Sequence, residues 1–279
     1  MKPCSAHVAP ARAGFTLVEL IVVVALVGLL ASMLAPTMAS TKPNSAAFQC
    51  QNNLRQLSFA WRMYADDNNG SLVYNGQGAG NSAATASWVG GWMDYSANPD
   101  NTNTALLIDH DKYPYGAFLG PYIKTPLAFK CPADRSTALI AGVPMPRVRS
   151  VSMNNIVGTG SRTAPIHSAG FPLCSNITQI KSPAYMFVVL DEREDSINDG
   201  CFSTDPNTLY QLVDYPASYH NNAGGFSFAD GHAEIHHWKD RRTMPALQPG
   251  QPLTLNINLP GDKDVLWLAQ HAAGLLSYP

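Results

Sequence analysis

The stretch Ala13-Gly14-Phe15-Thr16-Leu17-Val18-Glu19-Leu20 determines how the N-terminal segment of this chain is interpreted. A glycine precedes an apolar run, residues 15–34, in which Glu19 is the only ionisable side chain. A helix needs about 20 apolar residues to cross the roughly 30 Å of hydrocarbon in a bilayer. Residues 15–34 are therefore long enough to span a membrane.

The flanks of this run limit its interpretation. Residues 1–14 contain Lys2 and Arg12 and no acid, which favours a cytoplasmic N-terminus. A charged side chain inside a membrane helix costs about 2.5–3.5 kcal/mol on insertion scales, so Glu19 needs a partner. A secretory signal cut near Thr37-Met38-Ala39 and a plain signal anchor both leave Glu19 without a role.

The segment Gly14-Phe15-Thr16-Leu17-Val18-Glu19 resembles the class III signal of type IV pilins and type II secretion pseudopilins. The resemblance implies that a prepilin peptidase cuts between Gly14 and Phe15 and then methylates Phe15, the new N-terminus. It also implies that Glu19 neutralises the N-terminal amine of a neighbouring subunit during assembly. Opposite charges in a low-dielectric setting are tolerated when they are paired, which agrees with that role.

This resemblance also implies the partners and the location. The partners would be prepilin peptidase, other pilin-like subunits through the N-terminal helix, and an inner-membrane assembly machinery. The chain would cross the inner membrane once, with its head in the periplasm, and could later enter a filament. On this reading the protein is a prepilin-like structural subunit and not an enzyme.

Charge and composition agree with an exported protein. Lys2 and Arg12 leave with the leader, so 18 basic residues become 16 against 20 acidic ones, a formal charge near −4. This balance gives no support for nucleic-acid binding, which requires a basic face. Only 14% of the residues are charged, which favours an exported, loop-rich domain.

Four cysteines remain after the leader: Cys50, Cys131, Cys174 and Cys201. Disulfides form outside the cytoplasm, and four cysteines allow three connectivities. We favour Cys50–Cys131 with Cys174–Cys201, and the alternative is free thiols buried in the core.

A second helical stretch follows the apolar run. Leu54, Leu57, Trp61 and Tyr64 form one apolar stripe, and Gly70 supplies a stop signal. We expect an α+β fold of the type IV pilin kind, with a long N-terminal helix packed on an antiparallel sheet with long loops. The expected parts are a leader (1–14), a membrane and polymerisation half-helix (15–36), an amphipathic half-helix (37–69) and a globular head (70–279).

Residues 185–190 predict a buried strand in this head, and residues 147–157 predict another. The acidic run that follows the first of these, Asp191, Glu192, Glu194 and Asp195, is expected to be a solvated edge.

The C-terminal region contains His220, nine further residues and then Asp230-Gly231. Asp-Gly between two strand-like runs predicts a two-residue hairpin turn. Pairing Ala229 with His232 would place Phe226, Phe228, Ala233 and Ile235 on one apolar face, and Ser227, His232, Glu234 and His236 on the other.

This hairpin resembles the His-x9-Asp-Gly domain of many prepilin-like proteins. The same family is matched, in order, by Asn53-Leu54-Arg55-Gln56-Leu57, Tyr64-Ala65-Asp66-Asp67-Asn68-Asn69-Gly70, Cys131-Pro132-Ala133-Asp134 and Ser152-Met153-Asn154. The resemblance implies a place in a filament system and little about the role of the head.

The sequence contains two candidate metal sites, although we assign no metal to either. His232, Glu234 and His236 share one strand face at a spacing that zinc sites use. Asp262-Lys263-Asp264 is a candidate counterpart of the calcium loop of some pseudopilins, but calcium requires six to eight oxygen ligands and no recognisable loop supplies them.

Two other functions remain open. Trp88 and Trp92 lie in a polar loop, residues 74–104, and could serve a glycan-binding head, although two buried indoles that pin the loop are the preferred interpretation. A membrane-tethered metal-dependent hydrolase could use the hairpin histidines with Asp191 or Glu192. The sequence has no Gly-x-Ser-x-Gly, His-Glu-x-x-His or phosphate-binding loop to support it.

Overall fold

A computed structural model describes residues 16–158, 171 and 173–275, without the side chains of residues 28, 29 and 31–45. The chain divides into two compact units, Met1–Lys42 and Pro43–Pro279. We call the second unit the head and describe each unit by itself.

Helix α1 spans Leu17–Asp67 and begins with a capping box. The backbone N–H and the hydroxyl of Thr16 donate to Oε2 of Glu19, at 2.8 and 2.7 Å. The Glu19 N–H in turn donates to Oγ1 of Thr16 at 3.3 Å. This reciprocal pattern satisfies backbone donors that a helix start otherwise leaves unpaired.

No helix among the described residues meets the length and hydropathy needed to cross a membrane.

The head-side part of α1 carries the predicted apolar stripe. Leu54, Leu57 and Trp61 are fully buried, and Tyr64 packs against the same core. The helix ends at Asp67, and Asn69 and Gly70 follow with φ of 55° and 78°. Both the stripe and the stop predicted from the sequence are confirmed.

A five-stranded sheet forms the centre of the head. Its strand order is β5-β3-β4-β7-β8. The bounds are β3 Val151–Asn154, β4 Phe187–Asp191, β5 Cys201–Phe202, β7 Ala223–Phe228 and β8 Ala233–His237. The expectation of an antiparallel sheet is confirmed for three of its neighbouring pairs, but β3 and β5 are parallel.

The β7–β8 hairpin exists, but its predicted register is wrong by one residue. Ser227 pairs with Ala233 and Phe226 with Glu234. The turn uses a three-residue loop, in which the Gly231 N–H donates to the Phe228 carbonyl at 2.9 Å and Gly231 has φ of 96°. A type I turn followed by a left-handed glycine accounts for the extra residue.

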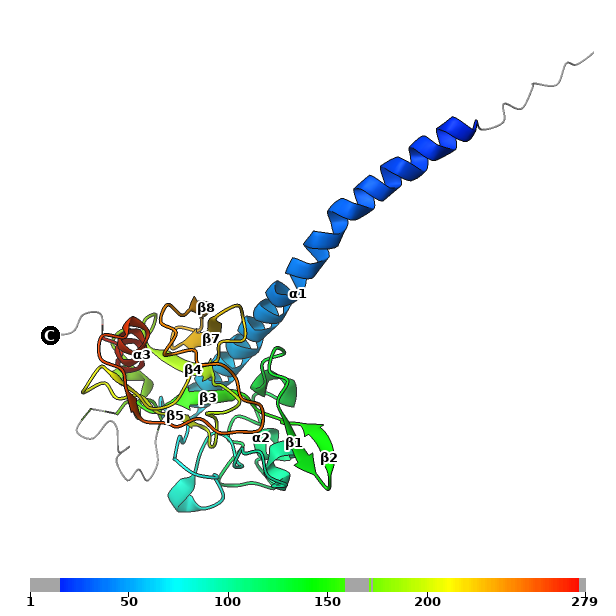
Figure 1. The fold of residues 1–279 in the computed structure, drawn as a ribbon. Helices are drawn as coiled ribbons and strands as arrows, with labels where there is room; N and C mark the ends of the chain where they lie inside the picture. The colour runs from blue at the N-terminus through cyan, green and yellow to red at the C-terminus, as the bar shows by residue number, and fades with distance from the viewer. Residues whose placement is uncertain (1–15, 159–170, 172, 276–279) are drawn as a thin grey trace, which may run out of the picture. The chain divides into compact units, whose positions relative to one another are not determined.

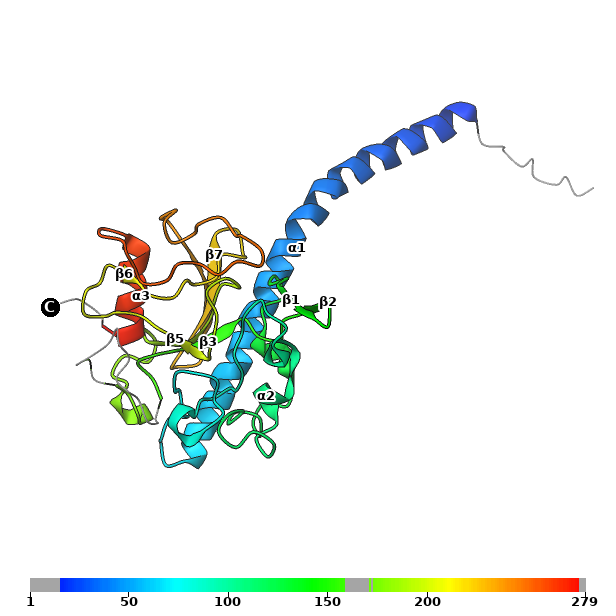
Figure 2. The same ribbon diagram turned by 60° about the horizontal axis from the view of Figure 1, so that its bottom comes forward.

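The corrected register shows which helix covers each face of the sheet. Phe226 faces α3, Lys263–Ala273, and its ring centroid lies 5.0 Å from that of Trp267. Gly225 faces α1 instead, because a Cβ atom there would lie 2.6 Å from Cδ1 of Leu54. Figures 1 and 2 show β3 and β7 lying between α3 and the head-side part of α1.

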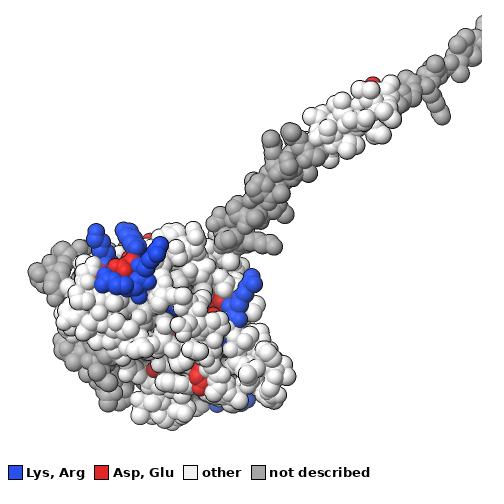
Figure 3. Space-filling model, in the orientation of Figure 1, with Lys and Arg blue, Asp and Glu red and all other residues white. Residues whose placement is uncertain are grey.

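Smaller elements surround this core. They are the strand pair β1 Thr137–Ile140 and β2 Val143–Pro146, the pair β6 Gln211–Leu212 and β9 Ile257–Asn258, the helix α2 Ala105–Ile108, and the 3-10 helices η1 Ala83–Thr85, η2 Pro99–Thr102, η3 Pro126–Phe129 and η4 Ile177–Gln179. The face of the head in Figure 3 carries few charged side chains, which agrees with the low charged fraction of the sequence.

The two tryptophans of the polar loop differ. Trp88 is fully buried, donates from Nε1 to the Gly200 carbonyl at 2.9 Å and stacks on Phe129. Trp92 is 38% exposed. The interpretation of two buried indoles is therefore confirmed for Trp88 and wrong for Trp92.

Candidate functional site

Four buried side chains from separate parts of the head converge on one point. Cys50 comes from α1, Cys131 follows η3, Asp191 ends β4, and His220 lies in the turn before β7. One ligand atom from each lies within 4.8 Å of all the others. Within the described ranges this is the one group that brings three or more such side chains together. We call it the Cys-Asp-His cluster.

The contacts within the cluster are short. The Cys50 thiol donates to Oδ2 of Asp191 at 2.6 Å. Sγ of Cys131 lies 3.2 Å from Nε2 of His220, and the same nitrogen lies 3.8 Å from Oδ2 of Asp191. The exposed fractions of the four residues range from 0 to 4%, so water does not screen these groups.

Local structure fixes each member of the cluster. Ser150 joins two of them, because its Oγ accepts the Cys131 N–H at 2.8 Å and donates to Oδ1 of Asp191 at 3.4 Å. Gly225 leaves space for Cys50, since a Cβ atom at position 225 would lie 2.7 Å from Sγ of Cys50. The His220 N–H donates to the Ala223 carbonyl at 3.1 Å, which holds the turn.

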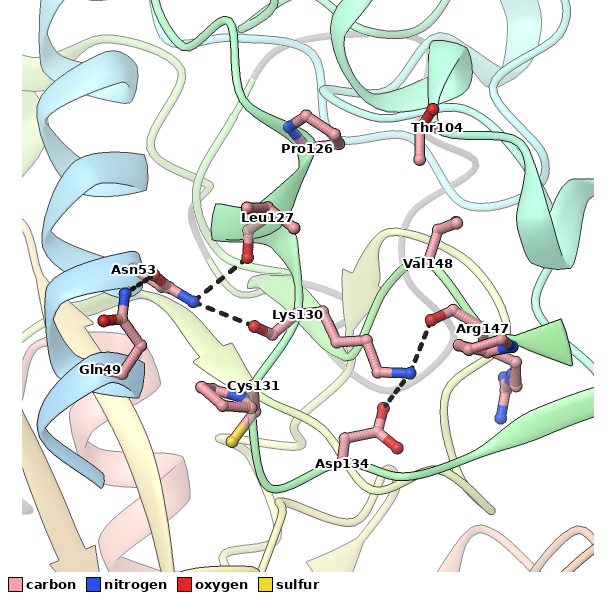
Figure 4. A pocket seen from close by; sticks show the side chains of 12 residues that line it. Gln49, Asn53, Thr104, Pro126, Leu127, Lys130, Cys131, Asp134, Arg147 and Val148 are labelled. Carbon is pink, nitrogen blue, oxygen red and sulfur yellow. Dashed lines mark hydrogen bonds and ion pairs between the residues drawn. The ribbon is translucent and has the colours of Figure 1, made fainter. Parts of the chain in front are cut away.

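Figure 4 shows how the loop with Cys131 is held against α1. Nδ2 of Asn53, on α1, donates to the carbonyls of Leu127 and Lys130 at 3.2 and 3.0 Å. A cavity of about 590 Å³ lies beside this contact, and Cys131 is among the residues that line it. The cavity is open to solvent, and Cys131 is the one cluster residue in its lining.

The pKa values of Cys50, Cys131 and His220 are shifted by their neighbours in the cluster. The hydrogen bond between the two thiols raises the pKa of Cys50 well above its ordinary value and lowers that of Cys131. Burial opposes protonation of His220, but hydrogen bonds with Asp191 and Cys131 outweigh it and raise its pKa to about 9.

This arrangement differs from a nucleophilic triad. In such a triad the nucleophile and the acid contact opposite nitrogens of the histidine, so that the acid orients the ring. Here Cys131 and Asp191 both face Nε2 of His220. Nδ1 has no hydrogen-bond partner among the described residues. The four side chains therefore share a common centre and do not form a proton relay.

The residues that the sequence proposed for zinc lie elsewhere and do not form a common centre. His232 contacts the carboxylate of Asp230 at 2.6 Å, within the hairpin turn. The ring of His236 stacks on Trp267 with 3.7 Å between centroids, and Nδ1 of His236 lies 3.9 Å from Oε1 of Glu234. Of the hairpin histidines considered, only His220 enters the Cys-Asp-His cluster.

Asp262 and Asp264 accept backbone N–H groups in the structure. Asp262 is the N-cap of α3 and accepts from the N–H of Asp264 at 2.9 Å and of Val265 at 3.3 Å. Oδ2 of Asp264 accepts from Lys239 and Asp240 at 2.8 and 2.7 Å. The Asp262 carboxylate thus caps α3, the Asp264 carboxylate holds the segment after β8, and calcium at this segment stays an untested expectation.

Of the two disulfides that the sequence favours, one joins cysteines that lie close together in the structure. Cys50 and Cys131 are free thiols whose sulfur atoms lie within 4.8 Å of each other. The backbone of Cys174 forms an isolated parallel β-bridge with Val157, and Cys201 begins β5. Disulfide connectivity for all four cysteines stays a prediction.

Sequence reasoning missed two features of this site. The acidic run after β4 is not a solvated edge, because Asp191, Glu192 and Asp195 are at most 3% exposed. In the sequence the cysteines indicate disulfides and the hairpin histidines indicate a metal site, and no local pattern links the two sets. The absence of a Cys-x-x-Cys pair removed the usual local signal of a zinc site.

The processing site cannot be placed in the same way. Gly14 and Phe15, the predicted cleavage and methylation positions, lie outside the described residues. Glu19 lies within them and forms the capping box with Thr16. Side chains of residues 17–27 are exposed and, apart from Glu19, apolar.

The comparisons with known proteins bear on this N-terminal segment. Residues 10–35 match the family described as prokaryotic N-terminal methylation motif. The chain matches no curated protein and no solved structure. The match identifies residues 10–35 as a prepilin-type signal and indicates a membrane-associated, type IV pilin-like subunit that is processed by prepilin peptidase and assembles with other pilin subunits.

Proposed function

We propose that this protein is a non-catalytic, prepilin-like structural subunit of a type II secretion or type IV pilus-related filament. The observation that carries the proposal is the methylation motif over residues 10–35, within which the long helix α1 begins at Leu17. In this proposal residues 15–36 anchor the subunit in the inner membrane and later form the seam between subunits. The head then sets the surface of the filament.

The surface of the first unit supports this role. Residues 17–27 present Leu, Val, Ile and Ala side chains that are exposed in the single chain. Extended apolar surface of this kind is rare on a soluble monomer and marks contact with lipid or with other chains. Glu19 is the one carboxylate among these residues, so a partner with a positive charge would complete the packing.

Processing is tested by the intact mass of the tagged full chain, expressed with and without a prepilin peptidase. We expect loss of residues 1–14 and gain of one methyl group only when the peptidase is present. Gly14→Glu should block both changes, because the peptidase cuts after this glycine. A mature chain that begins at Met1 or Ser40 would contradict the proposal.

Assembly is tested separately with Glu19→Val. This variant removes the charge and keeps an apolar side chain, so we expect normal processing and loss of cross-linked multimers in the membrane. The matched control is Val18→Leu, the neighbouring exposed position, which keeps the charge pattern intact. Equal cross-linking of both variants would contradict the assembly role of Glu19.

A second candidate function is a glycan-binding head carried on the same stem. Trp92 is 38% exposed and borders a cavity of about 380 Å³ that is also lined by Gln77, Asn198 and Asp199. Aromatic faces next to amide and carboxylate groups suit sugar rings. Binding to a panel of neutral oligosaccharides should disappear in Trp92→Ala and persist in Tyr115→Ala, a control with similar exposure. Absence of binding would exclude this candidate.

A further inference from the structure

The Cys-Asp-His cluster has the donor set of a closed metal site. Two sulfurs, one imidazole nitrogen and one carboxylate oxygen give four ligands, the number that structural zinc sites use. Thiolates favour zinc over calcium or magnesium, and the carboxylate is poorly suited to a soft ion such as Cu(I). The ligands come from α1, the loop after η3, the end of β4 and the turn before β7, so the site exists only in the folded head.

The distances fit such a centre. Zinc bonds of about 2.0–2.3 Å in a tetrahedron place ligand atoms about 3.3–3.8 Å apart. The contacts of His220 with Cys131 and Asp191 measure 3.2 and 3.8 Å. The contact between Cys50 and Asp191 is shorter, 2.6 Å, because the thiol donates a hydrogen bond there. A metal ion in place of that proton would separate the two atoms.

We propose that Cys50, Cys131, Asp191 and His220 bind one structural Zn²⁺ ion in the head. Both cysteines bind as thiolates and His220 binds through a deprotonated Nε2, and the protons that these groups carry pass to solvent. All four coordination positions belong to the protein, so no open position remains for substrate, and the ion has a structural role. It fastens α1 to the end of β4 and to the turn before β7.

The surroundings provide a second layer of support. Ser150 holds Oδ1 of Asp191 while Oδ2 points into the cluster. Such outer partners orient metal ligands, and their loss lowers metal affinity about 10–100-fold.

The first test is metal content of the full chain, purified in detergent with a reductant and without chelator. We expect about one zinc per chain, measured by inductively coupled plasma mass spectrometry. His220→Gln and Cys131→Ser should lose the zinc. The matched control His232→Gln should keep it, because His232 contacts only the hairpin turn and the face of Phe228.

A second measurement does not depend on variants that could misfold. Zinc is removed from the wild-type chain with a chelator and replaced by Co²⁺. A tetrahedral site with two thiolates should give strong visible d–d bands and a sulfur-to-cobalt charge-transfer band. Ser150→Ala should keep these bands and weaken cobalt affinity about tenfold.

Three results would overturn the proposal. They are a reduced wild-type chain that binds neither added zinc nor cobalt, equal zinc loss in His232→Gln and His220→Gln, and a Cys50–Cys131 disulfide in the protein isolated from its native compartment. The zinc site does not depend on the proposed filament role. An unprocessed Gly14→Glu chain should still bind zinc, so the failure of one proposal is distinguishable from the failure of the other.

Discussion

Nε2 of His220 lies 3.2 Å from Sγ of Cys131, although 89 residues separate them in the chain. This contact gives a physical meaning to the spacing between His220 and Asp230-Gly231. The intervening residues form a turn and then β7, so the histidine and the hairpin turn lie at opposite ends of one strand. The histidine serves the cluster, while Asp230 and Gly231 fix the return of the chain.

Gly225→Ala tests how tightly α1 is packed against β7. The added methyl would lie 2.6 Å from Cδ1 of Leu54 and 2.7 Å from Sγ of Cys50. Overpacking of this kind costs about 1–3 kcal/mol in the free energy of unfolding, which urea denaturation of the full chain in detergent measures.

The control for this change is Ser227→Ala, two residues further along the same face of β7. Its hydroxyl is buried and has no hydrogen-bond partner among the residues described. Removing an unsatisfied hydroxyl should leave stability unchanged or raise it by up to about 1 kcal/mol. Equal destabilisation by both variants would show that β7 tolerates no change at all and that the steric argument is wrong.

Asp195→Ala should destabilise the head strongly. Its carboxylate accepts two hydrogen bonds from Arg193, both at 2.8 Å, and both side chains are fully buried. Removing Asp195 leaves a buried guanidinium without its counter-charge, with the Pro245 carbonyl at 2.7 Å as a remaining acceptor, and breaking a buried ion pair in this way costs about 3–5 kcal/mol. Asp66→Ala breaks the exposed ion pair with Arg62 and should cost less than about 1 kcal/mol. Similar losses from the two variants would contradict the assigned role of burial.

Local patterns explain what could be predicted. The apolar stripe of Leu54, Leu57 and Trp61 has the helical period, and Gly70 marks the stop, so both features follow from neighbouring residues. The hairpin was predicted from Asp230-Gly231 for the same reason. Its register was not, because a two-residue and a three-residue loop share that dipeptide and differ by one residue in pairing.

The cluster could not be predicted because no local pattern contains it. Cys50, Cys131, Asp191 and His220 meet only after α1 packs on the sheet and the loop after η3 closes over them. Burial of Asp191 depends on the same packing. A run of acids after a strand is normally solvated, and only the tertiary structure shows that these carboxylates have partners.

Asp214→Asn should change how stability depends on pH. Burial, with the nearby charge of Asp199, raises the pKa of Asp214 from 3.8 to about 7, although the Ser203 N–H donates to it. The folded chain therefore binds a proton that the unfolded chain releases, and stability falls as pH rises from 3.8 to about 7. Melting temperatures of the full chain across this window should fall less steeply in Asp214→Asn. An unchanged slope would contradict the prediction.

His271→Phe should act in the opposite direction. The rings of Tyr185, His271, Trp267 and His236 stack in series, with centroid distances of 3.8, 4.0 and 3.7 Å. Burial lowers the pKa of His271 from 6.5 to about 4, and burial with the charge of His271 lowers that of His236 to about 4. A histidine held neutral stabilises the fold above 6.5, and this contribution is lost as pH falls from 6.5 towards 4.

Phenylalanine keeps the stack and cannot be protonated. We therefore expect the melting temperature of His271→Phe to depend less on pH between about 4 and 6.5, and to match the wild type more closely above that window. His236→Phe should produce the same flattening from the other side of Trp267, and the double variant should flatten the curve further. If neither variant changes the slope, the acid sensitivity of the head arises outside this ring stack.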